Sequence, residues 1–171
     1  KATGFGSGLW YRKRALQLAG LTPGMKVLDV ACGPGLVTQC AMELAGPSGS
    51  VTGLDPSIGM WREAQRGPCR SLVRGVGQHL PFPDGHFDFL SMGYALRHVP
   101  DLRGAFTEYR RVLKPGGILD IIVPTTDGPG AFQDPQHCSY WCLNSFMYYE
   151  AGNPHRERLK YANGVRAAFR V

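Results

Sequence analysis

Apolar and polar positions along the chain fall into blocks that predict strands alternating with helices. Short apolar runs bounded by glycine or proline are typical of buried strands. Segments with apolar residues three and four positions apart, closed by glycine or proline, are typical of helices. We predict strands at residues 25–31, 50–54, 70–75, 87–92, 118–123 and 165–171, and helices at residues 9–18, 36–45, 57–66 and 101–113.

This alternation predicts an α/β fold, a Rossmann-like doubly wound and mostly parallel sheet with helices on both faces. Ser57 and Asp101 are the expected N-caps of two helices, and the Lys-Pro-Gly-Gly stretch at residues 114–117 is expected to end the last one. Ligands of such sheets bind outside the carboxyl ends of the strands. The loops that follow the predicted strands are therefore where we look for chemistry.

The loop after the first predicted strand reads Asp-Val-Ala-Cys-Gly-Pro-Gly at residues 29–35. Gly33 and Gly35 let the backbone turn tightly and approach a ligand without an intervening Cβ, although a plain strand-to-helix turn would use the same glycines. Asp55 ends the second strand, where an acid can accept both hydroxyls of an adenosine ribose. The alternative for Asp55 is to cap the next helix, a place that Ser57 already fills.

Two details separate the cofactors that this pair of motifs could bind. A dinucleotide site favours Gly-x-Gly-x-x-Gly, and Thr38 stands at the third glycine position. Asp29, just before the glycine loop, would repel a pyrophosphate, whereas it suits a ligand with an ammonium and a sulfonium group. The residues therefore favour S-adenosylmethionine over NAD.

Four stretches in the same order resemble known motifs. VLDVACGPG at residues 27–35 is similar to the first motif of class I S-adenosylmethionine-dependent methyltransferases, and GLDPS at residues 53–57 is similar to their second. Residues 80–102 and 108–117 resemble the corresponding stretches of the ubiquinone/menaquinone C-methyltransferase family, the methyltransferase domain type 11 pattern. The resemblance covers roughly residues 9–123. It implies the Rossmann-like fold and S-adenosylmethionine as the methyl donor.

The resemblance also implies roles for particular residues. The cofactor-binding set that it implies, running from the methionine part through the ribose and adenine to the transferable methyl group, is Asp29, Ala31, Gly33, Gly35, Asp55, Pro56, Met60, Gly77, Gln78 and Met92. The sequence departs from the family at Val76, where an Asp usually accepts a hydrogen bond from the adenine amino group. Unless Gln78 or a backbone carbonyl substitutes, we expect weaker binding by about one hydrogen bond, ~0.5–1.5 kcal/mol.

The acceptor side is expected after the fourth predicted strand and in the tail. Tyr94 and Arg97 would face the acceptor, and His98 is a candidate general base, with a turn histidine of no catalytic duty as its alternative. His137, in a DP-x-H stretch, is a second candidate base on the same footing. Trp141 and Tyr148 belong to an aromatic-rich tail that would form either a wall for an apolar or planar acceptor or a satellite core.

We therefore predict an enzyme that transfers a methyl group to an O, N or C atom of a small-molecule acceptor by direct in-line displacement, releasing S-adenosylhomocysteine. The alternatives are a nucleic-acid methyltransferase and a non-catalytic cofactor-binding module. The net charge of +6 allows the first alternative, but the basic residues are scattered. An NPPY-like tetrapeptide is also missing from residues 92–95, so nucleic acid is an unlikely partner.

Length and composition add to this prediction. A chain of 171 residues fits one domain, with an N-terminal helical segment at 1–20 and a variable substrate-side tail at 124–171. Five cysteines without framework spacing favour free thiols and a cytoplasmic protein, and no apolar run reaches membrane-spanning length. His137, Cys138 and Cys142 do not complete a four-ligand set, so we predict no metal. Because the chain begins at Lys1, we expect residues to precede it.

Overall fold

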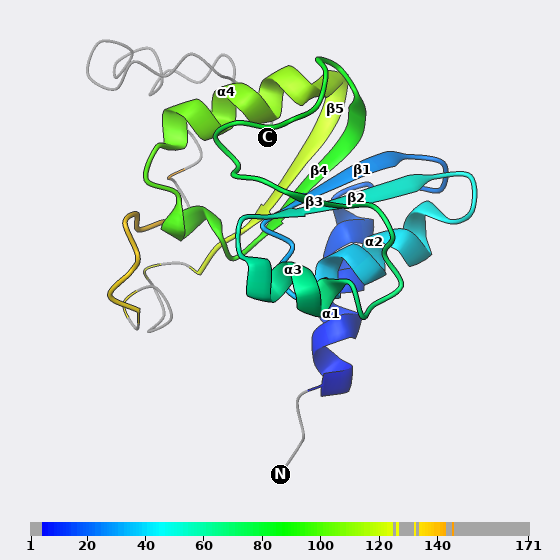
Figure 1. Cartoon of the computed structure of the whole chain (residues 1–171), viewed down its shortest axis with the longest axis horizontal. Coiled ribbons are helices and arrows are strands. Elements are labelled where there is room, and N and C mark those ends of the chain that lie inside the picture. Colours follow the sequence, from blue (N-terminus) through cyan, green and yellow to red (C-terminus); the bar gives the residue numbers. More distant parts are fainter. Residues whose placement is uncertain (1–4, 125, 127–131, 133, 143–144, 146–171) are drawn as a thin grey trace.

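The strands of this chain form one five-stranded parallel sheet. The computed structural model describes residues 5–124, 126, 132, 134–142 and 145. The sheet has the order β3-β2-β1-β4-β5 and every described pair in it is parallel (Figure 1). The α/β, Rossmann-like prediction is confirmed. The strands are β1 (Lys26–Val30), β2 (Ser50–Asp55), β3 (Leu72–Arg74), β4 (Phe87–Gly93) and β5 (Leu113–Ile122).

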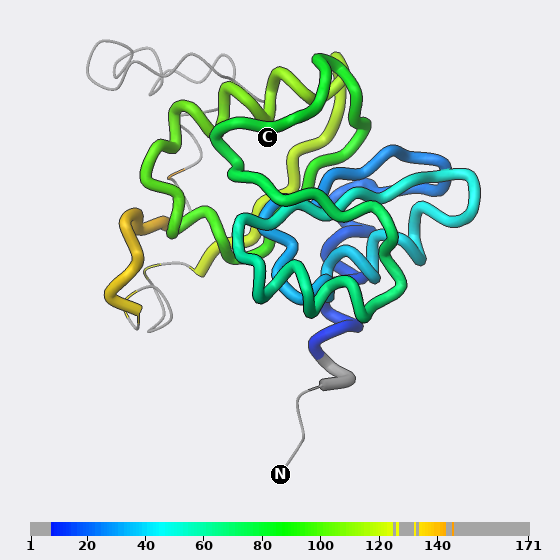
Figure 2. Tube along the Cα trace, viewed as in Figure 1, coloured from blue at the N-terminus to red at the C-terminus, as the bar shows by residue number. Residues whose placement is uncertain are grey.

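Helices cover both faces of the sheet, as predicted. Helices α1, α2 and α3 lie on one face and α4 lies on the other (Figure 1), and a short 3-10 helix, η1, precedes α4. The tube in Figure 2 follows the chain as it leaves the carboxyl end of one strand and returns to the start of the next. The bounds are α1 (Phe5–Leu18), α2 (Leu36–Ala45), α3 (Ile58–Ala64), η1 (Leu96–His98) and α4 (Leu102–Val112).

The two predicted helix caps are confirmed. The Ser57 side chain accepts a hydrogen bond from the backbone N–H of Met60, and the Asp101 side chain accepts one from Gly104. Each oxygen satisfies an N–H that has no partner within its own helix. No helix in the described part of the chain has both the length and the apolar character needed to cross a membrane.

Alternating side chains of the sheet divide the core into two layers. Val27 and Phe89 pack with Leu16 of α1 on one face. Leu28 and Leu90, their neighbours along the same strands, pack on the other face with a set from α4 and the loops around it that includes Phe106, Tyr109 and Val112. Because strand residues alternate between faces, both sides of the sheet are apolar and the central strands are buried.

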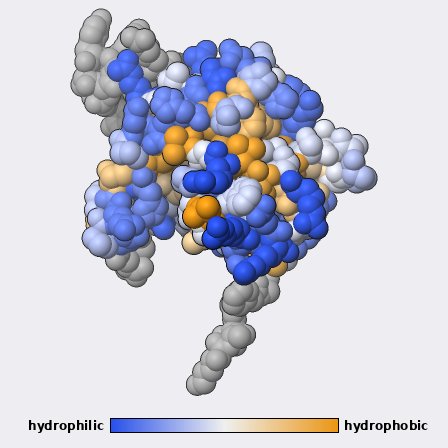
Figure 3. All heavy atoms as spheres, viewed as in Figure 1, coloured by the Kyte–Doolittle hydropathy of each residue, from blue (hydrophilic) through white to orange (hydrophobic). Residues whose placement is uncertain are grey.

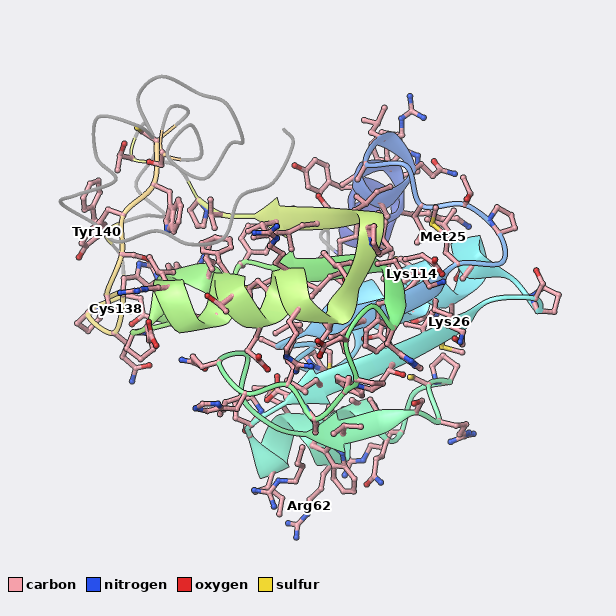
Figure 4. The ribbon with its side chains drawn as sticks, turned by 90° about the horizontal axis from the view of Figure 1, so that it is seen from above. Met25, Lys26, Arg62, Lys114, Cys138 and Tyr140 are labelled. Carbon is pink, nitrogen blue, oxygen red and sulfur yellow. The ribbon has the colours of Figure 1, made fainter. Side chains whose placement is uncertain are left out.

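The central pair β1 and β4 is where the strand order reverses. The chain moves from β1 toward β2 and β3 on one side, and toward β4 and β5 on the other. Ligands of such sheets bind at this point, outside the carboxyl ends. Figure 4 shows Cys138 and Tyr140 at one end of the sheet, and Met25, Lys26 and Lys114, which lie where strands begin, at the other. The described tail therefore lies at the carboxyl end, where the site is expected.

The start of β5 differs from the prediction. The strand was predicted to begin at residue 118, but β5 already begins at Leu113, which pairs with Phe87. The register shifts between Phe87 and Phe89. The Pro-Gly-Gly residues therefore form an irregularity within β5, and the strand continues beyond them. An ion pair of 2.5 Å between Lys114 Nζ and Asp88 Oδ1 holds this start against β4. The strand predicted at 165–171 lies outside the described residues.

Gly77 is needed for close packing between the loop after β3 and α4. A Cβ at this position would lie 2.7 Å from the Tyr109 hydroxyl and 3.3 Å from Val30 Cγ1. The hydroxyl is buried and contacts the Met92 sulfur at 3.9 Å. The loop therefore approaches the core only because position 77 carries no side chain.

We expect Gly77→Ala to lower the free energy of unfolding by roughly 1–3 kcal/mol, because the added methyl overpacks the contact with Tyr109. In a Tyr109→Phe background the same change costs less, since the opposing hydroxyl is gone. Urea unfolding of the four proteins of this cycle measures the coupling. Gly59→Ala is the control: its Cβ meets only Ser57 Oγ at 3.7 Å. Equal costs of Gly77→Ala in both backgrounds would contradict the packing argument.

Candidate cofactor and acceptor site

The loop after β1 adopts the tight turn that its glycines predict. Ala31, Gly33 and Gly35 have φ values of 55°, 56° and 87°, in the left-handed region. Glycine enters this region without strain, whereas Ala31 is held there against its preference. A Cβ at Gly33 would meet nothing within 4 Å. The backbone at Gly33 therefore faces open space that a ligand can enter.

Asp55 joins the end of β2 to this loop. Its Oδ2 accepts a hydrogen bond of 2.9 Å from the Gly33 N–H, and its Oδ1 accepts one of 2.8 Å from the Ser57 N–H. Asp55 is 6% exposed. The cap of α3 is Ser57, so Asp55 instead braces the turn. Each carboxylate oxygen keeps a further lone pair that can accept a hydroxyl.

Asp29 lies beneath the loop and points into the protein. It is 1% exposed, and its oxygens accept hydrogen bonds from the hydroxyls of Thr38 at 2.6 Å and Ser91 at 2.9 Å. Burial raises the pKa of the Asp29 carboxyl to about 6, and the two hydroxyls offset part of that rise. Sequence analysis missed both partners, although Thr38, at the third glycine position, was the available signal.

The positions predicted to hold adenine follow β2 and β3. Met60 on α3 is 47% exposed and Val76 is 43% exposed. Val76 and His79 form an isolated bridge, closed by the His79 N–H donating to the Val76 carbonyl at 3.1 Å. Gly77 and Gln78 therefore lie in a tight turn at the carboxyl edge of the sheet. Their contact with adenine, and that of Pro56, stays a prediction.

Met92 and Cys32, which lie near the glycine loop, are both buried. Met92, predicted beside the transferable methyl group, is 1% exposed and belongs to the core with Leu96 and Tyr109. Cys32 is buried, and burial together with the Asp29 and Asp55 carboxylates raises the pKa of its thiol to about 12. A thiol with this pKa stays protonated at neutral pH and is no nucleophile.

The end of β4 carries the residues predicted for the acceptor. Tyr94 has a φ of 62° and donates its N–H to the Ile122 carbonyl at 2.7 Å. The Arg97 guanidinium carbon lies 5.9 Å from the centre of the Tyr94 ring. Its Nε and Nη1 are buried and make no hydrogen bond to any residue that the structure describes. Tyr94 therefore has a strained backbone, and Arg97 has buried side-chain donors that no described residue accepts. Both features are typical of functional sites.

The structure brings together the two histidines predicted as general bases. The rings of His98 and His137 lie 4.9 Å apart between centroids, at an angle of 67°. Asp134 joins them: one ligand atom from each of the three residues lies within 4.8 Å of the others. Asp134 is the first residue of the DP-x-H stretch that the sequence analysis singled out, but no role was predicted for it.

The described aromatic residues of the tail differ in burial. Trp141 is 4% exposed and packs in the core cluster of α4, which supports the core alternative for this side chain. Phe132 and Tyr140 are exposed and stack on one another at 5.3 Å. Tyr148 lies outside the described residues. Figure 3 shows apolar side chains, in orange, gathered in the middle of the viewed face with polar side chains around them.

The raised pKa of Asp29 sets a pH dependence of stability. Between the ordinary pKa of 3.8 and the folded pKa of about 6, the folded protein binds more protons than the unfolded chain. The contribution of Asp29 to the free energy of unfolding therefore falls as pH rises through this window. We expect Asp29→Asn to remove this slope and to stabilise the cofactor-free protein at pH 7 by roughly 1–3 kcal/mol.

Urea unfolding of the parent and Asp29→Asn at several pH values between 4 and 7 measures the difference. Burial also raises the pKa of Asp120 to about 6, so only the difference between the two proteins reports Asp29. Ser91→Ala is the companion variant, because losing one hydroxyl raises the pKa of Asp29 further and extends the fall in stability to higher pH. Parallel pH profiles for all three proteins would contradict this account.

Comparison with known families agrees with this geometry. A family model described as "Methyltransferase domain" matches residues 28–121, more than half of the chain. The match runs from within β1 to within β5 and contains the glycine loop, Asp55 and the end of β4.

Individual relatives point the same way. Demethylmenaquinone methyltransferase of Desulfitobacterium hafniense is 39% identical over 137 residues, 72% of this chain and 53% of that protein. The chain spans about half the length of the curated relatives it matches. A methyltransferase from Aquifex aeolicus, described as SAM dependent, has a TM-score of 0.67 at 24% identity, covering 75% of this chain and 72% of its own. An S-adenosylmethionine dependent methyltransferase from Mesorhizobium loti has a TM-score of 0.60 at 28% identity, covering 70% and 55%. The chain therefore belongs to the class I S-adenosylmethionine-dependent methyltransferases, in the family of this methyltransferase domain.

Proposed function

We propose that this chain binds S-adenosylmethionine and transfers its methyl group to a small aromatic acceptor. One observation carries the proposal: Asp55, at the end of β2, is hydrogen-bonded to Gly33 in the strained loop after β1. The bond places a carboxylate with free lone pairs beside an open, glycine-lined turn at the carboxyl edge of the sheet. The two hydroxyls of a ribose and the charged methionine part of the cofactor fit such a site.

The residues present fit the cofactor. Asp55 would accept the ribose hydroxyls, and the exposed Met60 would pack on the adenine beside the turn at 77–78. Ala31, Gly33 and Gly35 would line the methionine part with backbone alone. When bound, S-adenosylmethionine supplies a methyl group on a positively charged sulfur. Asp29 lies beneath this loop and would favour that charge through the field of its carboxylate at neutral pH.

The acceptor that these residues suit is a planar ring with an ionisable hydroxyl group. Arg97 offers two buried N–H donors that no described residue uses, and a guanidinium that is left buried in this way favours an anionic oxygen. The neighbouring Tyr94 ring is partly exposed and suits an aromatic face. Relatives of this chain are named for demethylmenaquinone, a quinone, which supports the same acceptor class.

In this proposal the chain contributes alignment and charge. Arg97 would hold the acceptor oxygen as an anion, which raises the nucleophilicity of the ring atoms conjugated to it. Tyr94, fixed by its backbone bond to Ile122, would set the plane of the ring. Orientation of two reactants in one site supplies a large share of such rate enhancements. The base role predicted for His98 or His137 stays a prediction, and the pair is considered below.

Binding of S-adenosylhomocysteine tests the cofactor. We expect the parent to bind it in calorimetric titration, and Asp55→Ala to bind at least roughly tenfold more weakly, because hydrogen bonds to a charged group are worth ~1.5–3 kcal/mol. Asp84→Ala is the matched control, with the same loss of charge at a side chain that is 81% exposed. A folded parent that binds NAD and no S-adenosylhomocysteine would overturn the proposal.

Substitution of Arg97 tests the acceptor. With a hydroxylated naphthoquinol as acceptor, we expect Arg97→Met to lower kcat/KM by about 10–100-fold, the worth of one charged hydrogen bond. The affinity for S-adenosylhomocysteine stays unchanged. Arg103→Met, at an exposed position on α4, is the control and should keep full activity. An unaltered kcat/KM in Arg97→Met would contradict the proposal that Arg97 binds an anionic oxygen of the acceptor.

A further inference from the structure

We infer that His98, Asp134 and His137 form a binding site for a divalent transition-metal ion of the Zn²⁺ class. Each residue supplies one ligand atom, and these atoms lie within 4.8 Å of one another. Two imidazoles and one carboxylate are a ligand set that such ions prefer, and three protein ligands leave a position open. Ligands bound to one tetrahedral ion at about 2.0–2.2 Å stand roughly 3.4 Å apart, so the ligand atoms need to approach one another by at most roughly 1.4 Å.

Backbone contacts hold the three residues together before any ion binds. The His137 N–H donates to the Asp134 carbonyl at 3.2 Å, which forms a turn that brings the side chains of these two residues together. The Cys138 N–H donates to the Arg97 carbonyl at 2.8 Å and so fixes that turn beside His98 of η1. Segments about forty residues apart in sequence therefore contribute to one cluster by main-chain geometry.

The side chains differ in exposure in a way that suits ion entry. The His137 side chain is 1% exposed, that of Asp134 is 41% exposed, and His98 is exposed. One ligand is thus fixed in the protein while the other two face solvent, so an ion can enter without unfolding of the tail.

An acid–base pair is a weaker explanation of the same cluster. Asp134 Oδ2 lies 3.9 Å from His137 Nε2, too far for a hydrogen bond by which Asp134 would orient a catalytic imidazole through this nitrogen. Asp134 Oδ1 instead accepts the Gln136 N–H at 2.9 Å. An ion bound between the three ligand atoms accounts for their convergence, and it would occupy the lone pairs that a general base needs.

The cysteines that neighbour His137 in sequence are not part of the cluster. The Cys138 thiol points to the Arg97 carbonyl at 3.2 Å, and the Cys142 sulfur accepts from the Ser145 hydroxyl at 3.5 Å. One carboxylate leaves a bound dication with net positive charge, and Arg97 adds to it, so the open position favours an anionic oxygen. That the oxygen belongs to the acceptor rests on the proposed function, whereas metal binding itself does not.

Metal titration of the purified chain, freed of metal with a chelator, tests the site. We expect the parent to bind one equivalent of Zn²⁺, with His98→Ala and Asp134→Asn each at least roughly tenfold weaker. Asn keeps the oxygen that accepts from Gln136, so the turn survives. His79→Ala, which removes an exposed histidine elsewhere, and Cys138→Ser are the matched controls and should bind like the parent. Zn²⁺ should also raise the Tm of the parent and not that of His98→Ala.

Co²⁺ identifies the ligands, because a cobalt–thiolate bond gives an intense charge-transfer band that imidazole and carboxylate ligands do not give. We expect a cobalt spectrum without that band. Absence of stoichiometric binding by the parent, unchanged affinity in both ligand variants, or a thiolate band that disappears in Cys138→Ser would each overturn the inference. Titration with S-adenosylhomocysteine in the presence of chelator tests the cofactor site without metal. A failure of the metal site can therefore be distinguished from a failure of the cofactor site.

Discussion

The buried carboxylate of Asp29 is the interaction on which the arrangement of this chain depends. One oxygen accepts from Thr38 of α2 and the other accepts from Ser91 of β4, so one side chain of β1 ties three elements together at the point where the strand order reverses. A carboxylate that is 1% exposed is expensive to keep ionised. Its pKa of about 6 shows that the two hydroxyls offset burial only in part, and the remaining cost is what a bound cation would relieve.

The carboxyl edge of the sheet, next to Asp29, contains strained backbone. Ala31 after β1 and Tyr94 at the end of β4 are the non-glycine residues with positive φ among those described. Each is held by a bond to a neighbouring strand or loop: Asp55 braces the turn that contains Ala31, and the Ile122 carbonyl fixes Tyr94. Rigid strands thus force two adjacent loops into unfavourable conformations, which leaves the backbone between them open for a ligand.

The side on which we propose that the acceptor binds contains Arg97 and depends on the tail. Arg97 and the histidine–aspartate cluster lie together because residues 134–138 return to the chain that leaves β4. An anionic acceptor oxygen and a positively charged donor sulfur would then occupy opposite sides of the switch point, each facing a group of complementary charge. Burial of Trp141 in the core of α4 fixes where this tail crosses the sheet edge.

Local patterns in the sequence were sufficient for the elements and for the residues of the cofactor loop. Apolar runs and glycine stops placed β1, β2 and β4 within one residue at every end, and the hydroxyl and carboxylate caps at Ser57 and Asp101 followed from side-chain chemistry alone. The Lys-Pro-Gly-Gly stretch follows the end of α4 as predicted, but the next strand begins before it rather than at residue 118, because Leu113 pairs with Phe87. Such pairing depends on a partner strand that no local pattern contains.

The sequence by itself therefore determined the fold class, the glycine loop and the carboxylate opposite it, because these depend on spacings of a few residues or on the end of a neighbouring strand. Only the tertiary structure decided which polar groups meet. Thr38 and Ser91 reach Asp29 across separations of 9 and 62 residues, and Asp134 and His137 join His98 from a segment more than thirty residues further along the chain. The sequence left open whether Trp141 faces the acceptor or joins a core, and the structure buries it in the core together with Met92. The direction of a side chain follows from the packing of its whole element, which its neighbours along the chain do not specify.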